Sequence, residues 1–402
     1  MPTTVKLPRI DIAQPPISPA QERMSAPSHL KVKCIRNEAR FMALQDSWNA
    51  LAKKTNVGNV FLRHEWFVAA WEWVRDDAEL SIMCVWRHDS IVGICPLVRR
   101  AQRVCGLKLW RLEFLTVPDT QYCDFLCASA DARDILEAVS GALQQTPNHW
   151  DSCVLTHFEQ HSSAGQLPYA LQRKALKFTL SDFGGNPFVN LEGDWESFYA
   201  QRSRRLKKSN NLIANRLKRL GKIDVTWIKE VDAEGLESLN QAIVNISAQS
   251  WKTQTGLSLN HPTPQRFIRT LTRLANDNNW LSVWLLKLNG KAIAMEYQLR
   301  YQNQVHALRA DFDEQYSKQS PGAYLNWKIM ENLFNIGIQT YFMGPGKNPY
   351  KLRWSEQLRL LRKLEIYSNS WRGRVLHGLQ AYVRPMLRVV LQALKPQASP
   401  KS

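Results

Sequence analysis

The sequence predicts an α/β protein with two copies of one unit, each a mixed, largely antiparallel sheet flanked by helices, and a basic helical insertion between them. A strand–turn–strand pattern at 80–99 recurs without a gap at 281–300, 201 residues later. A helical pattern and then a strand pattern follow each hairpin, at 132–156 and 322–343. Residues 201–222, between the copies, hold nine basic side chains and no acidic one.

Length and charge limit what this protein can be. A chain of 402 residues suggests two or three domains. The formal net charge is +18, but residues 201–222 and 351–402 contribute +9 each, so the other 328 residues are balanced at 33 basic and 33 acidic side chains. This distribution excludes a uniformly basic protein that coats nucleic acid, and indicates a neutral globular protein with two basic elements.

The first unit is expected over residues 31–183. Residues 1–30 precede it and are predicted to be a disordered tail, because they are rich in proline and poor in apolar residues. Apolar residues at helical spacing predict helices over 38–53 and 64–75, and the tryptophans of the second helix are expected to pack in the core.

Cysteine usage indicates a reducing compartment. All seven cysteines lie in the first 153 residues and none forms a C-x-x-C pair, which is typical of reduced thiols in the core. Together with the lack of a long apolar run, this predicts a cytoplasmic protein. A zinc site is the alternative use of some of these side chains: Cys123, Cys127, His149 and His157.

The second unit is expected over residues 184–370, after a boundary at 184–187. It includes the basic helix 195–221, which reads as one helix or a pair, with Asp194 as its N-cap and Gly221 just beyond its end. Two interpretations of its basic side stay open: exposure to solvent, or binding of an anionic partner. No acidic residue is available there to pair with the basic side chains within the helix.

Two neighbouring strands in the second unit carry the candidate catalytic carboxylates. If Gln302 and Asn303 form the turn between them, Glu296 faces Arg309, and Asp311 lies on the same side of the sheet. Glu296 is then either a partner in a cross-strand ion pair or a carboxylate at a cleft that could act as a general base.

The next helix begins in a pattern suited to phosphate. Ser320 suits the N-cap and Pro321 the first helical position, while Gly322 lets a ligand approach the backbone. The free N–H groups and the positive end of the helix dipole would attract an anion. The equivalent place in the first unit has Asp131 and Asp134 but no glycine, so the first unit is not expected to bind such a cofactor.

The loop at 344–351 follows the next strand and concentrates special residues. Its two glycines and two prolines predict a stiff, shaped loop, and a plain turn is the alternative. Lys347 and Lys351 add positive charge, and Tyr350 offers a hydroxyl group.

These patterns resemble the GCN5-related N-acetyltransferase (GNAT) fold, and more closely the CelD group of bacterial GNAT proteins, which is associated with cellulose and exopolysaccharide production. The tandem units with a basic helical insertion are also similar to FemAB-type aminoacyl transferases. The resemblance to the CelD group spans about residues 35–370 and rests on five segments: 61–66, 92–97, 250–252, 320–322 and 344–351.

The resemblance implies an acyl-CoA-dependent acyltransferase with an amine or hydroxyl acceptor. A tyrosine at the position of Tyr350 would protonate the leaving thiolate, and a carboxylate on a neighbouring strand, first Glu296 and second Asp311, would deprotonate the acceptor. Tyr324 departs from the family pattern, which has a small residue there. The cofactor would be acetyl-CoA or another acyl-CoA, held at the helix start by Gln319, Ser320, Gly322 and Ala323 with Lys351 nearby.

Three functions therefore stay open. The first is an acyl-CoA-dependent transferase in exopolysaccharide or cell-envelope production, and the second a FemAB-like transferase whose basic segment 202–222 would bind tRNA. The third is a non-catalytic GNAT-fold scaffold of a membrane synthase complex. Residues 371–402 are predicted to be a basic amphipathic tail, and 371–395 would lie on an anionic surface of the inner membrane or dock onto protein.

Overall fold

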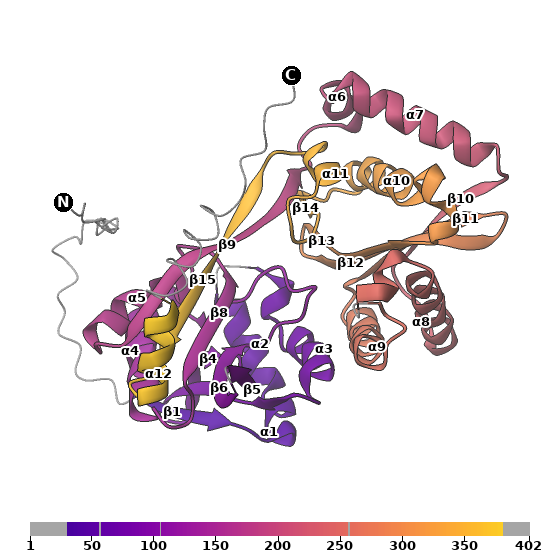
Figure 1. Cartoon of the computed structure of the whole chain (residues 1–402). Coiled ribbons are helices and arrows are strands. Elements are labelled where there is room, and N and C mark those ends of the chain that lie inside the picture. Colours follow the sequence, from indigo (N-terminus) through magenta and orange to yellow (C-terminus); the bar gives the residue numbers. More distant parts are fainter. Residues whose placement is uncertain (1–29, 56–57, 105, 256–257, 381–402) are drawn as a thin grey trace.

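Two lobes make up the molecule, and two long strands connect them (Figure 1). The computed structural model describes residues 30–55, 58–104, 106–255 and 258–380. The connecting strands β9 (Lys177–Asn190) and β15 (Leu358–Tyr367) pair antiparallel with each other. They join both lobes into one eleven-stranded sheet in the order β10-β11-β12-β13-β14-β9-β15-β8-β6-β5-β2. The boundary expected at 184–187 falls inside β9.

The N-terminal lobe holds a separate four-stranded sheet and part of the large one. The small sheet has the order β1-β3-β4-β7: Leu30–Ile35, Ile82–Arg87, Ser90–Cys95 and Leu126–Cys127. The strands of the large sheet are β2 (Ala78–Leu80), β5 (Leu97–Val104), β6 (Leu107–Phe114) and β8 (Ser152–Phe158). The helices are α1 (Glu38–Met42), α2 (Gln45–Lys54), α3 (His64–Val74), α4 (Ala132–Gln145) and α5 (Ser163–Arg173).

The C-terminal lobe is a sheet with a helix layer on each face (Figure 1). Its strands are β10 (Ile223–Ile228), β11 (Leu281–Leu288), β12 (Lys291–Tyr301), β13 (Gln304–Phe312) and β14 (Thr340–Phe342). One layer holds α6 (Trp195–Ala200), α7 (Arg204–Lys218) and α10 (Pro321–Asn335). The other holds α8 (Ala233–Ala248) and α9 (Pro262–Asp277). Short segments are η2 (Val60–Leu62), η3 (Ser129–Asp131), η4 (Trp251–Thr255), η5 (Glu314–Gln319) and α11 (Pro349–Leu352).

Both copies of the expected hairpin form. β3 and β4 pair antiparallel, as do β11 and β12. Asn289 and Gly290 have φ values of +49° and +86°, which suit the tight turn that an Asn-Gly pair favours. The copies diverge at equivalent places. Pro96 separates β4 from β5, which enters the large sheet, whereas the corresponding Tyr297 lies within the continuous strand β12.

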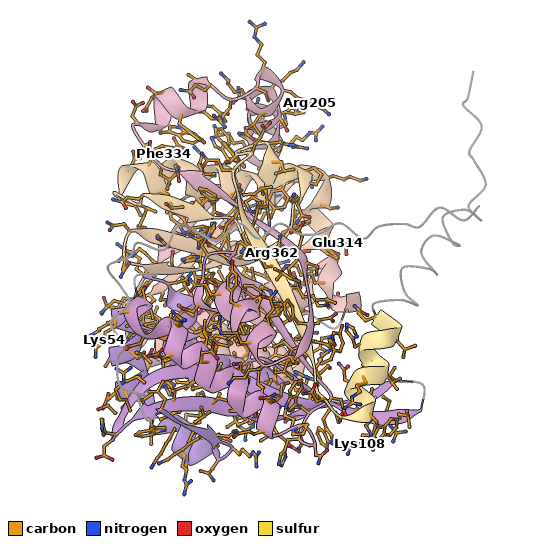
Figure 2. All side chains as sticks on the ribbon, turned by 90° about the vertical axis from the view of Figure 1, so that its left-hand side faces the viewer. Lys54, Lys108, Arg205, Glu314, Phe334 and Arg362 are labelled. Atoms are coloured by element: carbon orange, nitrogen blue, oxygen red, sulfur yellow. The ribbon has the colours of Figure 1, made fainter. Side chains whose placement is uncertain are left out.

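The basic insertion is a pair of helices rather than one. Asp194 caps α6 by accepting a hydrogen bond from the Ser197 amide at 2.7 Å, and Ser203 caps α7. The apolar side of α7 packs on α10. Figure 2 shows Arg205 of α7 extending from the top of the molecule into solvent. The exposed residues of this helix include Arg204, Arg205, Lys208, Leu212, Arg216 and Lys218.

The C-terminal basic tail is described only in part. α12 (Trp371–Gly378) packs on β15, while Trp371, Val375 and Leu379 are more than 40 % exposed. The rest of the expected amphipathic stretch lies outside the described residues, as does the N-terminal tail up to residue 29. Among the described helices, none is both long and apolar enough to cross a membrane. Over the same residues, no group of three metal-ligating side chains forms, so the expected alternative at the cysteines does not assemble there.

Candidate functional site

A cavity of about 510 Å³ opens where two strands of the C-terminal lobe separate. β13 pairs with β14 only over Gln304–His306, because β14 ends at Phe342 while β13 continues to Phe312. The edge of β13 from Ala307 to Ala310 therefore faces the cavity. Four segments of the chain line it: 251–252, 296–312, 317–326 and 341–351.

Because of a β-bulge in β13, the candidate carboxylates have other cross-strand partners than expected. The turn at Gln302 and Asn303 forms as predicted, with Tyr301 opposite Gln304. The register then shifts between Tyr297 and Gln298, so that Glu296 lies opposite Ala310. The expected Glu296–Arg309 pair was wrong, because one inserted residue turns every later side chain of the strand to the other face.

The side chains of Arg309 and Asp311 therefore lie on one face of the sheet, and that of Glu296 lies on the other. Arg309 forms a buried ion pair with Asp119 of the N-terminal lobe, at 2.8 Å between Nε and Oδ2. Asp311 has an ion pair with Lys252, whose Nζ lies 2.5 Å from Oδ1. Asp311 does not line the cavity. The geometry thus favours Glu296 over Asp311 as the carboxylate available for chemistry.

Glu296 is a buried carboxylate on the cavity wall, surrounded by hydrogen-bond donors. Its Oε1 accepts hydrogen bonds from the Tyr341 hydroxyl and, at 2.7 Å, from Gln298 Nε2. Its Oε2 accepts from Asn326 Nδ2 at 3.3 Å. Burial raises the pKa of Glu296, and these hydrogen bonds and the nearby Lys351 oppose the rise. A carboxylate with a raised pKa suits general-base chemistry near neutral pH.

A second row of hydrogen bonds holds Gln298, the neighbour of Glu296. Gln298 Oε1 accepts from Trp284 Nε1 at 3.1 Å and from Ser282 Oγ at 2.9 Å. Because both donors point at the amide oxygen, the amide nitrogen is directed toward Glu296. Burial, and then the Glu296 carboxylate, raise the pKa of Tyr341 well above its ordinary value, so its hydroxyl stays a donor.

The Tyr350 and Lys351 positions lie together on the short helix α11. Both side chains line the cavity. Tyr350 is 42 % exposed. Burial and then the Glu296 carboxylate raise its pKa, so its hydroxyl keeps its proton at neutral pH. Lys351 donates to the carbonyls of Gly344 and Pro345 at 3.0 and 2.8 Å, and burial lowers its pKa to about 8.

The start of α10 has some of the features expected of a phosphate site and lacks others. Ser320 is the N-cap but has φ +50°, and its side chain makes no capping hydrogen bond. Its carbonyl accepts from the amides of Ala323 and Tyr324, which reduces the free donors at this end. Ser320, Gly322 and Ala323 line the cavity, whereas Gln319 does not.

The structure adds lining residues that the sequence did not single out. Asn326 and Tyr341 complete the shell around Glu296, and Trp251 and Lys252 form the wall near η4. The segment 250–252 carried part of the family resemblance, and that was the available signal for the last two. Asn326 had no signal, because one asparagine in a helix is unremarkable until its partner is known.

The loop after β14 depends on one glycine. Gly344 has φ +83°, and a Cβ there would lie 2.8 Å from the Ala307 carbonyl oxygen on β13. Gly346 has φ +88° but open space around it. We expect Gly344→Ala to lower the midpoint of thermal unfolding more than Gly346→Ala, because both variants carry the same φ penalty and only the first adds a clash. Equal midpoints would show that the Ala307 contact does not constrain the loop.

The part of the chain that carries this site matches a known protein family. Residues 204–352 match the model of the acetyltransferase (GNAT) domain family. Over these residues the chain is similar to a GNAT acetyltransferase domain. No curated protein sequence shows significant similarity to the chain. The matched region includes the bulged strand β13, the start of α10 and the loop that lines the cavity.

Solved structures are similar over both lobes. FemX has a TM-score of 0.54 at 11 % identity, with 87 % of this chain and 99 % of FemX covered. The C-terminal domain of an Agrobacterium fabrum protein described as a lysylphosphatidylglycerol synthetase has a TM-score of 0.51 at 12 % identity, with 85 % and 97 % covered. A Bacteroides thetaiotaomicron protein of unknown function has a TM-score of 0.52 at 10 % identity, with 84 % and 100 % covered. At such identities the likeness shows the fold alone, and the expected tandem GNAT-like α/β fold is confirmed.

The equivalent place in the N-terminal lobe has a different character. Asp131, at the start of α4, forms an ion pair with Arg87 of β3 at 2.8 Å. A carboxylate at a helix start occupies the place that an anionic ligand would take. An anionic donor would therefore meet a like charge here, and donor binding by the C-terminal lobe alone stays a prediction.

Proposed function

We propose that this protein is an acyl-CoA-dependent acyltransferase acting on an amine or hydroxyl acceptor in bacterial exopolysaccharide or cell-envelope production, with a link to cellulose as in the CelD group. The observation that carries the proposal is the buried, hydrogen-bonded Glu296 in a cavity between separating strands, beside the start of α10. The GNAT domain match supports acyl transfer as the reaction class.

The cavity suits an acyl-CoA donor in several respects. Gly322 presents no side chain at the start of α10, and the backbone edge of β13 is open beside it. Lys351 and Lys252 supply positive charge at the walls. We assign Ser320, Gly322 and Ala323 to hold the donor phosphates, with the helix dipole favouring them. Gln319, which does not line the cavity, drops out of this set.

An acyl thioester would supply an activated carbonyl carbon. Two protons are transferred in the reaction, one to Glu296 and one from Tyr350. Glu296 takes the proton that the acceptor nitrogen or oxygen loses as its bond to the acyl carbon forms. Tyr350 donates a proton to the sulfur as the carbon–sulfur bond breaks. Glu296 then releases its proton to solvent, and Tyr350 regains one from solvent. Tyr341, Gln298 and Asn326 hold the carboxylate in place.

Calorimetric titration with acetyl-CoA and longer acyl-CoAs tests the donor. We expect the wild type to bind and Gly322→Asp to lose binding at least about tenfold, because a carboxylate at the helix start repels phosphate. Gly141→Asp in α4, where a side chain meets open space, is the matched control and should bind like the wild type. Absence of binding by the wild type to any acyl-CoA would remove this function.

A FemAB-like, aminoacyl-tRNA-dependent transferase is the second candidate. It is favoured by the exposed basic side of α7 and by the fold likeness to FemX over nearly the whole of that chain. Arg216 of α7 donates to the carbonyl of Lys318 at 3.3 Å, so the basic helix reaches the segment that leads to the cavity. This candidate would be supported if the wild type binds no acyl-CoA but binds tRNA, with an affinity that falls steeply as the salt concentration rises.

Contact with an anionic membrane surface through 371–395 remains part of the proposal, with a cytoplasmic protein peripheral at the inner membrane. The described part supports it through Trp371 and Val375 of α12 and Leu379 directly after it, which are exposed at four-residue spacing. Arg372 and Arg374 lie between them in sequence.

A further inference from the structure

A second cavity, of about 830 Å³, opens between the two lobes and has no role in the function proposed above. Trp73 of α3 and residues of β5, β6 and β8 form its wall in the N-terminal lobe. Phe183 of β9 and Lys363 of β15 contribute from the connecting strands, and Pro345 from the loop after β14. Its size falls in the range of small-molecule sites, which often lie between domains.

This cavity adjoins the site around Glu296. Pro345 lines both cavities. Arg309 lines the first, and its guanidinium carbon lies 5.3 Å from the ring centroid of Trp73, which lines the second. One layer of side chains thus separates the two. A ligand held in the second cavity could extend past Pro345 toward Glu296.

The charges on its wall are closely paired. Arg100 Nε donates to Glu113 Oε1 at 2.9 Å, and Arg111 Nη2 lies 2.5 Å from Glu113 Oε2. Arg100 also pairs with Asp77, so the two arginines share two carboxylates of the wall. Lys363 Nζ lies 2.8 Å from Glu365 Oε1. These matched pairs leave little surplus positive charge for a phosphate, and their presence breaks the apolar surface that an acyl chain would need. They suit an uncharged ligand rich in hydroxyl groups, which can donate to carboxylates and accept from guanidinium groups.

The aromatic side chains supply flat apolar faces between these pairs. Phe183 is 41 % exposed, and its ring lies 4.5 Å from that of His157. His157 has φ +64°, an uncommon conformation that the surrounding fold must hold. Burial lowers its pKa to about 4, so it is a neutral hydrogen-bonding group at pH 7. Aromatic faces next to paired polar groups match the two sides of a sugar ring, apolar C–H faces and hydroxyl edges.

We propose that the second cavity binds the acceptor of the transfer, and that this acceptor is an oligosaccharide whose ring stacks on Phe183. The proposal rests on the proposed function only in calling the ligand an acceptor. Pro345 then marks where the acceptor chain passes toward Glu296, and the Arg309–Trp73 contact forms the wall between the two ligands.

Titration calorimetry with a glucose tetramer, which is uncharged and rich in hydroxyl groups, tests the proposal. We expect the wild type to bind it and Phe183→Ala to bind about fivefold more weakly, because an aromatic stacking partner is lost. Leu360→Ala is the matched control, since Leu360 is 63 % exposed on the neighbouring strand β15 and does not line the cavity. The control should bind like the wild type, and all three proteins should share one thermal midpoint.

The outcomes separate this proposal from the proposed function. Absent binding of the tetramer to the wild type, or equal binding by Phe183→Ala, would overturn the sugar site even if acetyl-CoA binds. Tetramer binding that depends on Phe183 without any acyl-CoA binding would support the site and remove the acyl-CoA donor. If both ligands bind and only the tetramer depends on Phe183, the two cavities have the assigned roles.

Discussion

Glu296→Gln is expected to lower the turnover number by about 10²–10⁴-fold, the usual contribution of a general base. The amide has nearly the shape of the carboxylate but cannot take a proton, so acyl-CoA affinity should be unchanged. Release of free CoA thiol from acetyl-CoA with the glucose tetramer as acceptor measures the rate. Glu314→Gln, an exposed carboxylate on η5, is the matched control and should keep the wild-type rate.

The pH profile separates catalysis by Glu296 from a structural role. Because burial raises the pKa of Glu296, the acidic limb of the rate profile should lie above the pH at which an ordinary glutamate titrates. Tyr341→Phe removes a donor that stabilises the carboxylate, so the limb should move to higher pH. A wild-type rate for Glu296→Gln would contradict the assignment and direct attention to Asp311→Asn.

Arg309→Met is expected to lower the free energy of unfolding by about 3–5 kcal/mol near pH 7, because it leaves the buried Asp119 carboxylate without its partner. Burial already raises the pKa of Asp119, and loss of Arg309 should raise it further. The folded variant then binds a proton that the unfolded chain releases, so its stability should fall as pH rises toward 7 and recover at about pH 5. Urea unfolding at both pH values measures this.

Two controls test whether burial causes the loss. Arg87→Met breaks the Arg87–Asp131 pair, whose side chains are 33 % and 31 % exposed, and should cost less than about 1 kcal/mol. The double variant Arg309→Met/Asp119→Leu should recover much of the loss, since no unpaired charge remains. If the double variant is as unstable as the single one, packing rather than charge would explain the effect.

Local sequence signals predicted the parts of the fold that short-range physics controls. The Asn289-Gly290 turn requires two positive φ values, and its alternating flanks form β11 and β12 around it. The apolar spacing of α4 and the Ser-Pro start of α10 placed the first residue of each helix within one residue of its observed position. The boundary at 184–187 could not be judged locally, because β9 is held there by pairing with β15, a strand that follows more than 160 residues later.

The candidate site divides in the same way. Residue type and motif spacing predicted that Glu296, Gly322, Tyr350 and Lys351 share one site, and all four line the cavity. Which carboxylate faces the cavity depends on the folded sheet, since the bulge in β13 turns Arg309 and Asp311 away from Glu296. The tertiary structure also decided the partners Asn326 and Tyr341 and the second cavity, because contacts between distant segments depend on how the sheet closes and leave no local pattern in the chain.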